Sequence, residues 1–214
     1  MPTELIDGVH DVTLKTEPQR YRAYLIEADV PTLFDAGFGD TTDALFSGIE
    51  SVGVEPERVV ITHEDHDHVG GLEAVVERYD VETWAPADDA DAIVEGYGVE
   101  PDHRYEDGDT IGPFEAVHVP GHTPGCSVLV NAAEDYAVTG DVLVGADQRG
   151  LPEGYLLPPA GVFTDDPASA EANLDNLLGH DFSVALVFHG SAVLEGASEK
   201  LERFVNFEGR PNPA

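Results

Sequence analysis

The chain has 214 residues, 42% of them apolar, which is enough to bury a sizeable core in one domain. It carries 43 Asp and Glu against 10 Lys and Arg, a formal net charge of −33, which argues against a nucleic-acid partner because phosphate contacts need basic residues. Its single cysteine excludes an intrachain disulfide. With no signal peptide and no apolar run of membrane-spanning length, we expect a cytoplasmic protein without a membrane partner.

The acidic residues are spread along the whole chain and do not form a block. Such a surface repels itself at low salt, and dissolved salt screens the repulsion. The simplest hypothesis is a halophilic protein from a cell with molar internal salt. Its unfolding temperature should then rise with the KCl concentration.

The first third of the chain is predicted to contain strands and one helix. Residues 5–14 and 20–35 have strand character, and a polar turn at residues 15–19 separates them. The second segment ends in a glycine-bearing loop, Asp35-Ala36-Gly37. The helix that follows has apolar residues on one face, namely Leu45, Phe46 and Ile49.

The next stretch combines a buried strand, a histidine-rich loop and a helix. The run Val59-Val60-Ile61 predicts the strand, and residues 72–79 have apolar residues at helical spacing. Between them, residues 63–68 carry three imidazoles and three carboxylates. The carboxyl end of a strand is where α/β layers usually bind ligands, and these side chains suit zinc, iron or manganese. The alternative is a solvated polar loop in an acid-rich chain, but the histidines recur later in matching contexts.

The middle of the chain alternates short strands with turns. We expect a strand at residues 81–85, a short acidic helix at 87–96, a loop at 97–108 and a strand at 110–119. A turn then carries Pro120-Gly121-His122-Thr123-Pro124-Gly125. Residues 126–130 and 136–139 form a predicted hairpin that ends at Gly140-Asp141.

Residues 145–165 lack periodicity, and so long a loop in a compact domain is usually functional. Its aromatic side chains Tyr155 and Phe163 either line a pocket or cover the core. The same two roles are predicted for Phe38, which lies earlier in the chain. A helix then begins with Asp166 as its cap and Pro167 at its first position. Its predicted buried face consists of Ala170, Leu174, Leu177 and Leu178.

The carboxyl-terminal region is predicted to hold a buried strand at residues 184–188 that ends at His189. A last amphipathic helix, about residues 193–206, should bury Leu194, Leu201 and Val205. Residues 209–214 are predicted to fray.

Five positions share one context, a strand followed by a glycine-rich turn with Asp or His: Asp35, residues 63–68, His122, Asp141 and His189. Strand ends on one edge of a layered sheet lie near one another, so we expect these side chains to converge. A two-metal hydrolytic site needs such convergence because its metals stand roughly 3.5–4 Å apart.

These motifs, in this order, resemble the metallo-β-lactamase fold superfamily. They are Phe34-Asp35-Ala36-Gly37, Thr62 to Gly71, Pro120 to Gly125, Thr139-Gly140-Asp141 and Phe188-His189-Gly190. The resemblance implies an α+β fold, a four-layer αββα sandwich of two mixed sheets flanked by helices, as a single domain over residues 1–214.

The resemblance also implies a ligand set. His63 and His122 would hold the first metal; Asp67, His68 and His189 would hold the second; and Asp141 would bridge both. Asp35 would orient a ligand imidazole. Asp65 stands where the family has its second histidine, so we predict Asp65 as a carboxylate ligand. Relatives with a carboxylate there include di-iron oxidoreductases, so iron or manganese stands beside two zinc ions as the predicted cofactor.

The function implied is a metal-dependent hydrolase in which a dinuclear-metal-activated hydroxide attacks a small ester, thioester or lactone, with Asp67 orienting the hydroxide. One alternative is a non-haem iron oxidoreductase, di-iron or mononuclear, on the same fold. Another is a non-catalytic metal-binding relative. The predicted partner is a small-molecule substrate, and the sequence indicates no oligomeric state.

Overall fold

The computed structural model describes residues 2–17 and 20–207. The chain divides into two compact units, residues 1–105 (unit 1) and 106–214 (unit 2). Each unit is described by itself, and the single domain over residues 1–214 stays a prediction. Part of the predicted turn at residues 15–19, and the predicted frayed tail at residues 209–214, lie outside the described residues.

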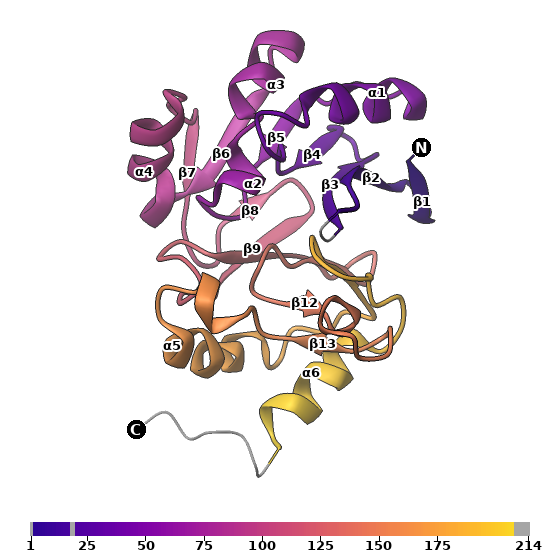
Figure 1. The fold of residues 1–214 in the computed structure, drawn as a ribbon, viewed down its shortest axis with the longest axis vertical. Helices are drawn as coiled ribbons and strands as arrows, with labels where there is room; N and C mark the ends of the chain where they lie inside the picture. Colours follow the sequence, from indigo (N-terminus) through magenta and orange to yellow (C-terminus); the bar gives the residue numbers. More distant parts are fainter. Residues whose placement is uncertain (1, 18–19, 208–214) are drawn as a thin grey trace. The chain divides into compact units, whose positions relative to one another are not determined.

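Unit 1 contains a seven-stranded mixed sheet whose strands follow one another in chain order (Figure 1). Strands β1 to β4 pair antiparallel, and β4 to β7 pair parallel. Phe34 lies opposite Val60, so β4 and β5 end at the same edge of the sheet. The strands are β1 Thr3–Ile6, β2 Val9–Lys15, β3 Tyr21–Ile26, β4 Thr32–Phe34, β5 Arg58–Val60, β6 Glu82–Pro86 and β7 His103–Tyr105.

The helices of unit 1 pack on this sheet through one apolar cluster, in which Leu45, Leu72 and Ile93 from three helices join Leu33 and Val59 from the strands. The predicted helices at residues 72–79 and 87–96 are confirmed. The helices are α1 Thr42–Val52, α2 His66–Val69, α3 Leu72–Tyr79 and α4 Ala87–Tyr97.

Two predictions for unit 1 need correction. Residues 5–14, predicted as strand, form a hairpin that turns at Gly8, whose φ is 69°. The predicted loop at residues 97–108 contains β7, which pairs with β6. Three residues are too few to show a strand period in the sequence. The Tyr105 hydroxyl at the end of β7 donates a hydrogen bond of 2.7 Å to the Ile61 carbonyl and so supports the end of β5.

Unit 2 contains a five-stranded mixed sheet in the order β14-β11-β10-β9-β8. The predicted hairpin of β10 and β11 is confirmed, and β14 adds in parallel beside β11. The predicted loop at residues 145–165 holds a small antiparallel pair, β12 and β13, and two 3-10 turns, η1 and η2. The elements are β8 Thr110–Ile111, β9 Phe114–His118, β10 Ser127–Asn131, β11 Tyr136–Val138, β12 Val144–Gly145, η1 Ala146–Arg149, β13 Leu156–Leu157, η2 Gly161–Phe163 and β14 Val184–Leu186.

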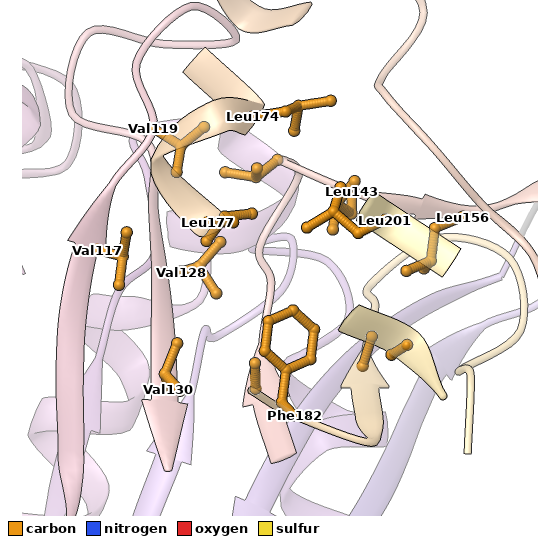
Figure 2. Packing of buried hydrophobic residues seen from close by; sticks show 14 of the residues in the cluster. Val117, Val119, Val128, Val130, Leu143, Leu156, Leu174, Leu177, Phe182 and Leu201 are labelled. Atoms are coloured by element: carbon orange, nitrogen blue, oxygen red, sulfur yellow. The ribbon is translucent and has the colours of Figure 1, made fainter. Parts of the chain in front are cut away.

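The core of unit 2 joins the sheet to the helical segments that follow residue 166. Val128, Leu177 and Phe182 lie in one apolar cluster (Figure 2). Asp166 caps its helix as predicted, accepting bonds of 3.1 Å from the Ala168 and Ser169 amides. The Ser169 hydroxyl bond lowers the pKa of Asp166. The helical elements are α5 Pro167–Ala172, η3 Asn173–Leu177 and α6 Ala197–Val205.

Two leucines predicted to be buried in unit 2 are exposed. Leu178 is 39% exposed because the helical segment ends at Leu177 and the backbone becomes extended there. Leu194 is 48% exposed because α6 begins only at Ala197, so Leu194 does not share its apolar face. Among residues 2–17 and 20–207, no helix has the length and apolar character that a membrane crossing requires.

Candidate functional site

The histidine-rich loop of unit 1 gathers four candidate ligands, His63, Asp65, Asp67 and His68, which we call the first cluster. After β5 the chain bends at His63 and Glu64, is extended at Asp65, and then turns through the short helix α2, which carries Asp67 and His68. The two ring centroids lie 4.1 Å apart. Asp65 Oδ2 lies 3.7 Å from His63 Nε2, and Asp67 Oδ2 lies 3.9 Å from His68 Nε2. The Nε2 atom of each of these two imidazoles therefore faces a carboxylate oxygen.

Asp35, at the end of β4, fixes the protonation of these two rings. Its Oδ1 accepts a 2.8 Å bond from the Thr62 amide, and its Oδ2 accepts a 2.8 Å bond from the Thr62 hydroxyl. Asp35 Oδ2 also lies 2.7 Å from His68 Nδ1. A carboxylate only accepts, so His68 Nδ1 carries the proton and His68 Nε2 keeps a lone pair for a metal.

Thr62 extends this control to His63. Its hydroxyl proton is used on Asp35, so the hydroxyl oxygen accepts from His63 Nδ1, 3.0 Å away. His63 Nε2 then also keeps its lone pair. Thr62 was not among the predicted site residues, although its place between the predicted strand at residues 59–61 and His63 was a usable signal.

Negative charge accumulates around this loop. Buried Asp89, in α4, accepts a 3.0 Å bond from the Glu64 amide and so ties the loop to the helix. Burial raises the pKa of Tyr97, and the charges of Asp65 and Asp67 raise it further. A cation bound at the first cluster would offset this field.

A second loop is held against the first cluster by backbone bonds. The Ala36 amide donates to the His68 carbonyl at 2.7 Å, and the Gly71 amide donates to the Gly37 carbonyl at 3.0 Å. The approach is so close that a Cβ on Gly71 would stand 2.4 Å from the Ala36 oxygen. The partly buried side chain of Phe38 extends from this loop.

Unit 2 brings together His122, Asp141 and His189, which we call the second cluster. Asp141 Oδ2 lies 3.1 Å from His189 Nε2 and 3.6 Å from His122 Nε2. The three residues follow β9, β11 and β14, and each comes beside a glycine with positive φ: 140° at Gly121, 51° at Gly140 and 74° at Gly190. Tight turns after three strands thus place one carboxylate next to two imidazoles.

Thr164 is a further side chain at the second cluster, and it was not among the predicted site residues. Its hydroxyl donates to the Ala160 carbonyl at 3.0 Å and lies 3.4 Å from His122 Nδ1. A hydroxyl whose proton is used accepts from Nδ1, which leaves His122 Nε2 on the side of Asp141. No sequence motif links residues 122 and 164.

The remaining predicted residues lie outside the two clusters. His66 has a side chain that is 74% exposed. Tyr155 and Phe163 are 58% and 74% exposed in unit 2, and their role in a pocket stays a prediction. Four imidazoles and three carboxylates remain as candidate ligands, with no thiolate among them, and this donor chemistry fits zinc, iron or manganese.

The sequence profile of the Metallo-beta-lactamase superfamily matches residues 19–181, well over half of the chain. The probable metallo-hydrolase YqgX of Bacillus subtilis is 31% identical over 137 residues, 56% of this chain and 64% of that protein. A hydroxyacylglutathione hydrolase of Serratia proteamaculans is 32% identical over 111 residues, 50% of this chain and 41% of that protein. The match thus spans less than two thirds of either relative.

Solved structures agree with this match. Rubredoxin oxygen:oxidoreductase from Desulfovibrio gigas is similar with a TM-score of 0.78 at 18% identity, covering 96% of this chain and 61% of that one. TTHA1623, solved in a di-iron-bound form, is similar with a TM-score of 0.69 at 25% identity, covering 92% of this chain and 98% of that one. The chain belongs to the metallo-β-lactamase superfamily and has its α+β fold of mixed sheets with flanking helices.

Proposed function

We propose that this protein is a metal-dependent hydrolase of small thioesters, with esters and lactones as related substrates. The observation that carries the proposal is the bonding of Asp35 and Thr62, which turns two buried imidazoles so that each keeps its Nε2 for a metal. Thioesters come first because a relative at 32% identity is named hydroxyacylglutathione hydrolase.

The proposed ligands are the seven side chains of the two clusters, with two zinc ions as the cofactor. Bound divalent cations supply a Lewis acid for the substrate carbonyl and lower the pKa of water. The assignment rests on the order of the family motifs and on the donor groups in each cluster.

Asp67 is the proposed catalytic residue of the chain. Its side chain is 14% exposed, whereas Asp35 is fully buried. Asp67 Oδ2 also lies at the Nε2 edge of His68, at 3.9 Å. A carboxylate in this position would bind a metal and also orient the attacking hydroxide. Asp35, which accepts hydrogen bonds from three donors, holds the imidazole of His68 directly and that of His63 through Thr62.

The alternative is a non-haem iron oxidoreductase. It is favoured by Asp65, an oxygen donor where the family pattern has histidine, because a carboxylate suits manganese and, combined with histidines, is typical of non-haem iron sites. The relative at 25% identity that was solved in a di-iron-bound form points the same way.

Metal content and turnover together test the proposal. The protein is purified in molar KCl, its metals are measured by mass spectrometry, and it is assayed on a panel of thioesters, esters and lactones. We expect about two zinc ions per chain and hydrolysis that Asp67→Asn reduces. Bound iron with a visible absorption band and no hydrolysis would overturn the proposal in favour of the oxidoreductase.

Asp65→His sharpens the choice of metal. A third imidazole at that position should raise the zinc-to-iron ratio of the purified protein severalfold if Asp65 is a ligand. An unchanged ratio would remove Asp65 from the ligand set.

A further inference from the structure

Among residues 2–17 and 20–207, Lys15 has no carboxylate partner, in a chain with a net charge of −33. Its Nζ lies 5.5 Å from the centroid of the Phe38 ring, and among the described residues it makes no ion pair. Three arginines of the same unit do form ion pairs: Arg22 with Asp11, Arg58 with Glu82, and Arg104 with Asp91. Lys15 therefore differs from these three arginines in that no carboxylate offsets its charge.

Aromatic rings surround the Phe38 side chain beneath this cation. Tyr21 and His66 meet the Phe38 ring edge to face, with centroids 4.9 and 5.0 Å away. Lys15 and Tyr21 lie opposite each other where β2 and β3 meet. We call Lys15, Tyr21, Phe38 and His66 the Lys15 patch. It offers an ammonium group beside partly exposed apolar ring surface.

The backbone attaches the Lys15 patch to the first cluster. His66 begins α2, the helical turn that carries Asp67 and His68. The loop of Phe38 is bonded to the same segment through Ala36 and Gly37. A molecule that touches the patch therefore lies next to candidate metal ligands of the same unit.

We propose that the Lys15 patch is a substrate-binding subsite, in which Lys15 pairs with a carboxylate of an acidic thioester and the rings contact its alkyl part. The inference rests on the proposed function and names its substrate class. An anionic substrate approaching a surface this acidic is repelled, and a cation left unneutralised at the point of binding gives local attraction. The aromatic rings of the patch give the alkyl part of the substrate an apolar contact surface that carries no charge.

The test compares two thioesters with the same acyl group, one on glutathione, which bears carboxylates, and one on neutral N-acetylcysteamine. Lys15→Met keeps the alkyl stem and removes the charge. It should raise the ratio of KM for the acidic substrate to KM for the neutral one by about fivefold, as expected for a partly exposed ion pair. The effect should shrink as KCl rises, because salt screens the pair.

Two control variants define the origin of the effect. Lys15→Arg restores the charge and should restore the KM ratio. Lys200→Met removes the other lysine, whose Nζ bonds to the Glu195 carbonyl in unit 2, and should leave the ratio unchanged. A KM ratio unaffected by Lys15→Met, or equally affected by Lys200→Met, overturns the subsite.

Binding measured without turnover separates the subsite from the proposed function. Titration calorimetry of S-methylglutathione on the metal-loaded protein should show about fivefold weaker binding in Lys15→Met. If no thioester is hydrolysed but this difference remains, the function fails and the subsite stands. If thioesters are hydrolysed but the difference is missing, or the wild type binds no S-methylglutathione, the subsite fails.

Discussion

The two clusters reach similar chemistry by different means. In the first, four candidate ligands come from one short loop, and side-chain hydrogen bonds from Asp35 and Thr62 set the imidazole protons. In the second, three candidate ligands follow the ends of three strands, and glycine turns bring two imidazoles next to one carboxylate. The first should therefore be sensitive to hydrogen-bond chemistry, and the second to charge at Asp141 and to backbone shape.

The largest effect is expected from Asp141→Asn. This change removes the anionic oxygen that lies 3.1 and 3.6 Å from two imidazoles. Metal content should fall below two per chain, and kcat/KM should drop by at least about 100-fold, since even a group that only supports a ligand costs 10–100-fold. Glu134 is an exposed carboxylate beyond the other end of β11. The variant Glu134→Gln is therefore the control, and it should change neither the metal content nor kcat/KM.

Asp35→Asn tests the first cluster without altering the backbone. Asp35 has a φ of 58°, which asparagine tolerates. An amide NH2 facing His68 Nδ1 would force the proton to Nε2, the position needed for a metal. Metal affinity should fall by about 10–100-fold in a chelator competition. Unchanged affinity would mean that Asp35 serves the fold alone.

The four candidate ligands of the first cluster could be selected from the sequence because they are contiguous and follow a strongly apolar strand, and their role as ligands stays a prediction. It predicted His122, Asp141 and His189 only through a resemblance, since no local pattern joins three separate strand ends. Thr62 and Thr164 were missed because hydroxyl groups are common and their role depends on tertiary distance. The same limit explains Leu178 and Leu194, whose burial depends on where a helix ends or begins. A three-residue strand such as β7 carries too little periodicity to recognise.

Gly121→Ala tests the backbone dependence of the second cluster. Gly121 has a φ of 140°, and an added Cβ would stand 2.2 Å from the Ala170 amide nitrogen. Strain and overpacking together should lower the free energy of unfolding by about 2 kcal/mol. Chemical denaturation at high salt measures it.

The control for Gly121→Ala is Gly96→Ala, in the interior of α4. An added Cβ at Gly96 meets nothing within 4 Å, so the change should raise the free energy of unfolding by up to about 1 kcal/mol through helix propensity. Equal loss of stability in both variants would contradict a specific role for the turn at Gly121.

The smallest effect is expected from Thr62→Val, which keeps the β-branched shape and removes the hydroxyl. Asp35 still accepts from the residue 62 amide and from His68, so only the orientation of His63 is released. The change removes the hydroxyl's bonds to Asp35 and to His63, and loss of the bond to His63, about 1 kcal/mol, should weaken metal binding by about fivefold. Thr62→Ser keeps the hydroxyl and should bind metal as the wild type does. If serine weakens binding as much as valine, the methyl contact at residue 62 matters and the hydroxyl does not, and His63 must owe its orientation to packing.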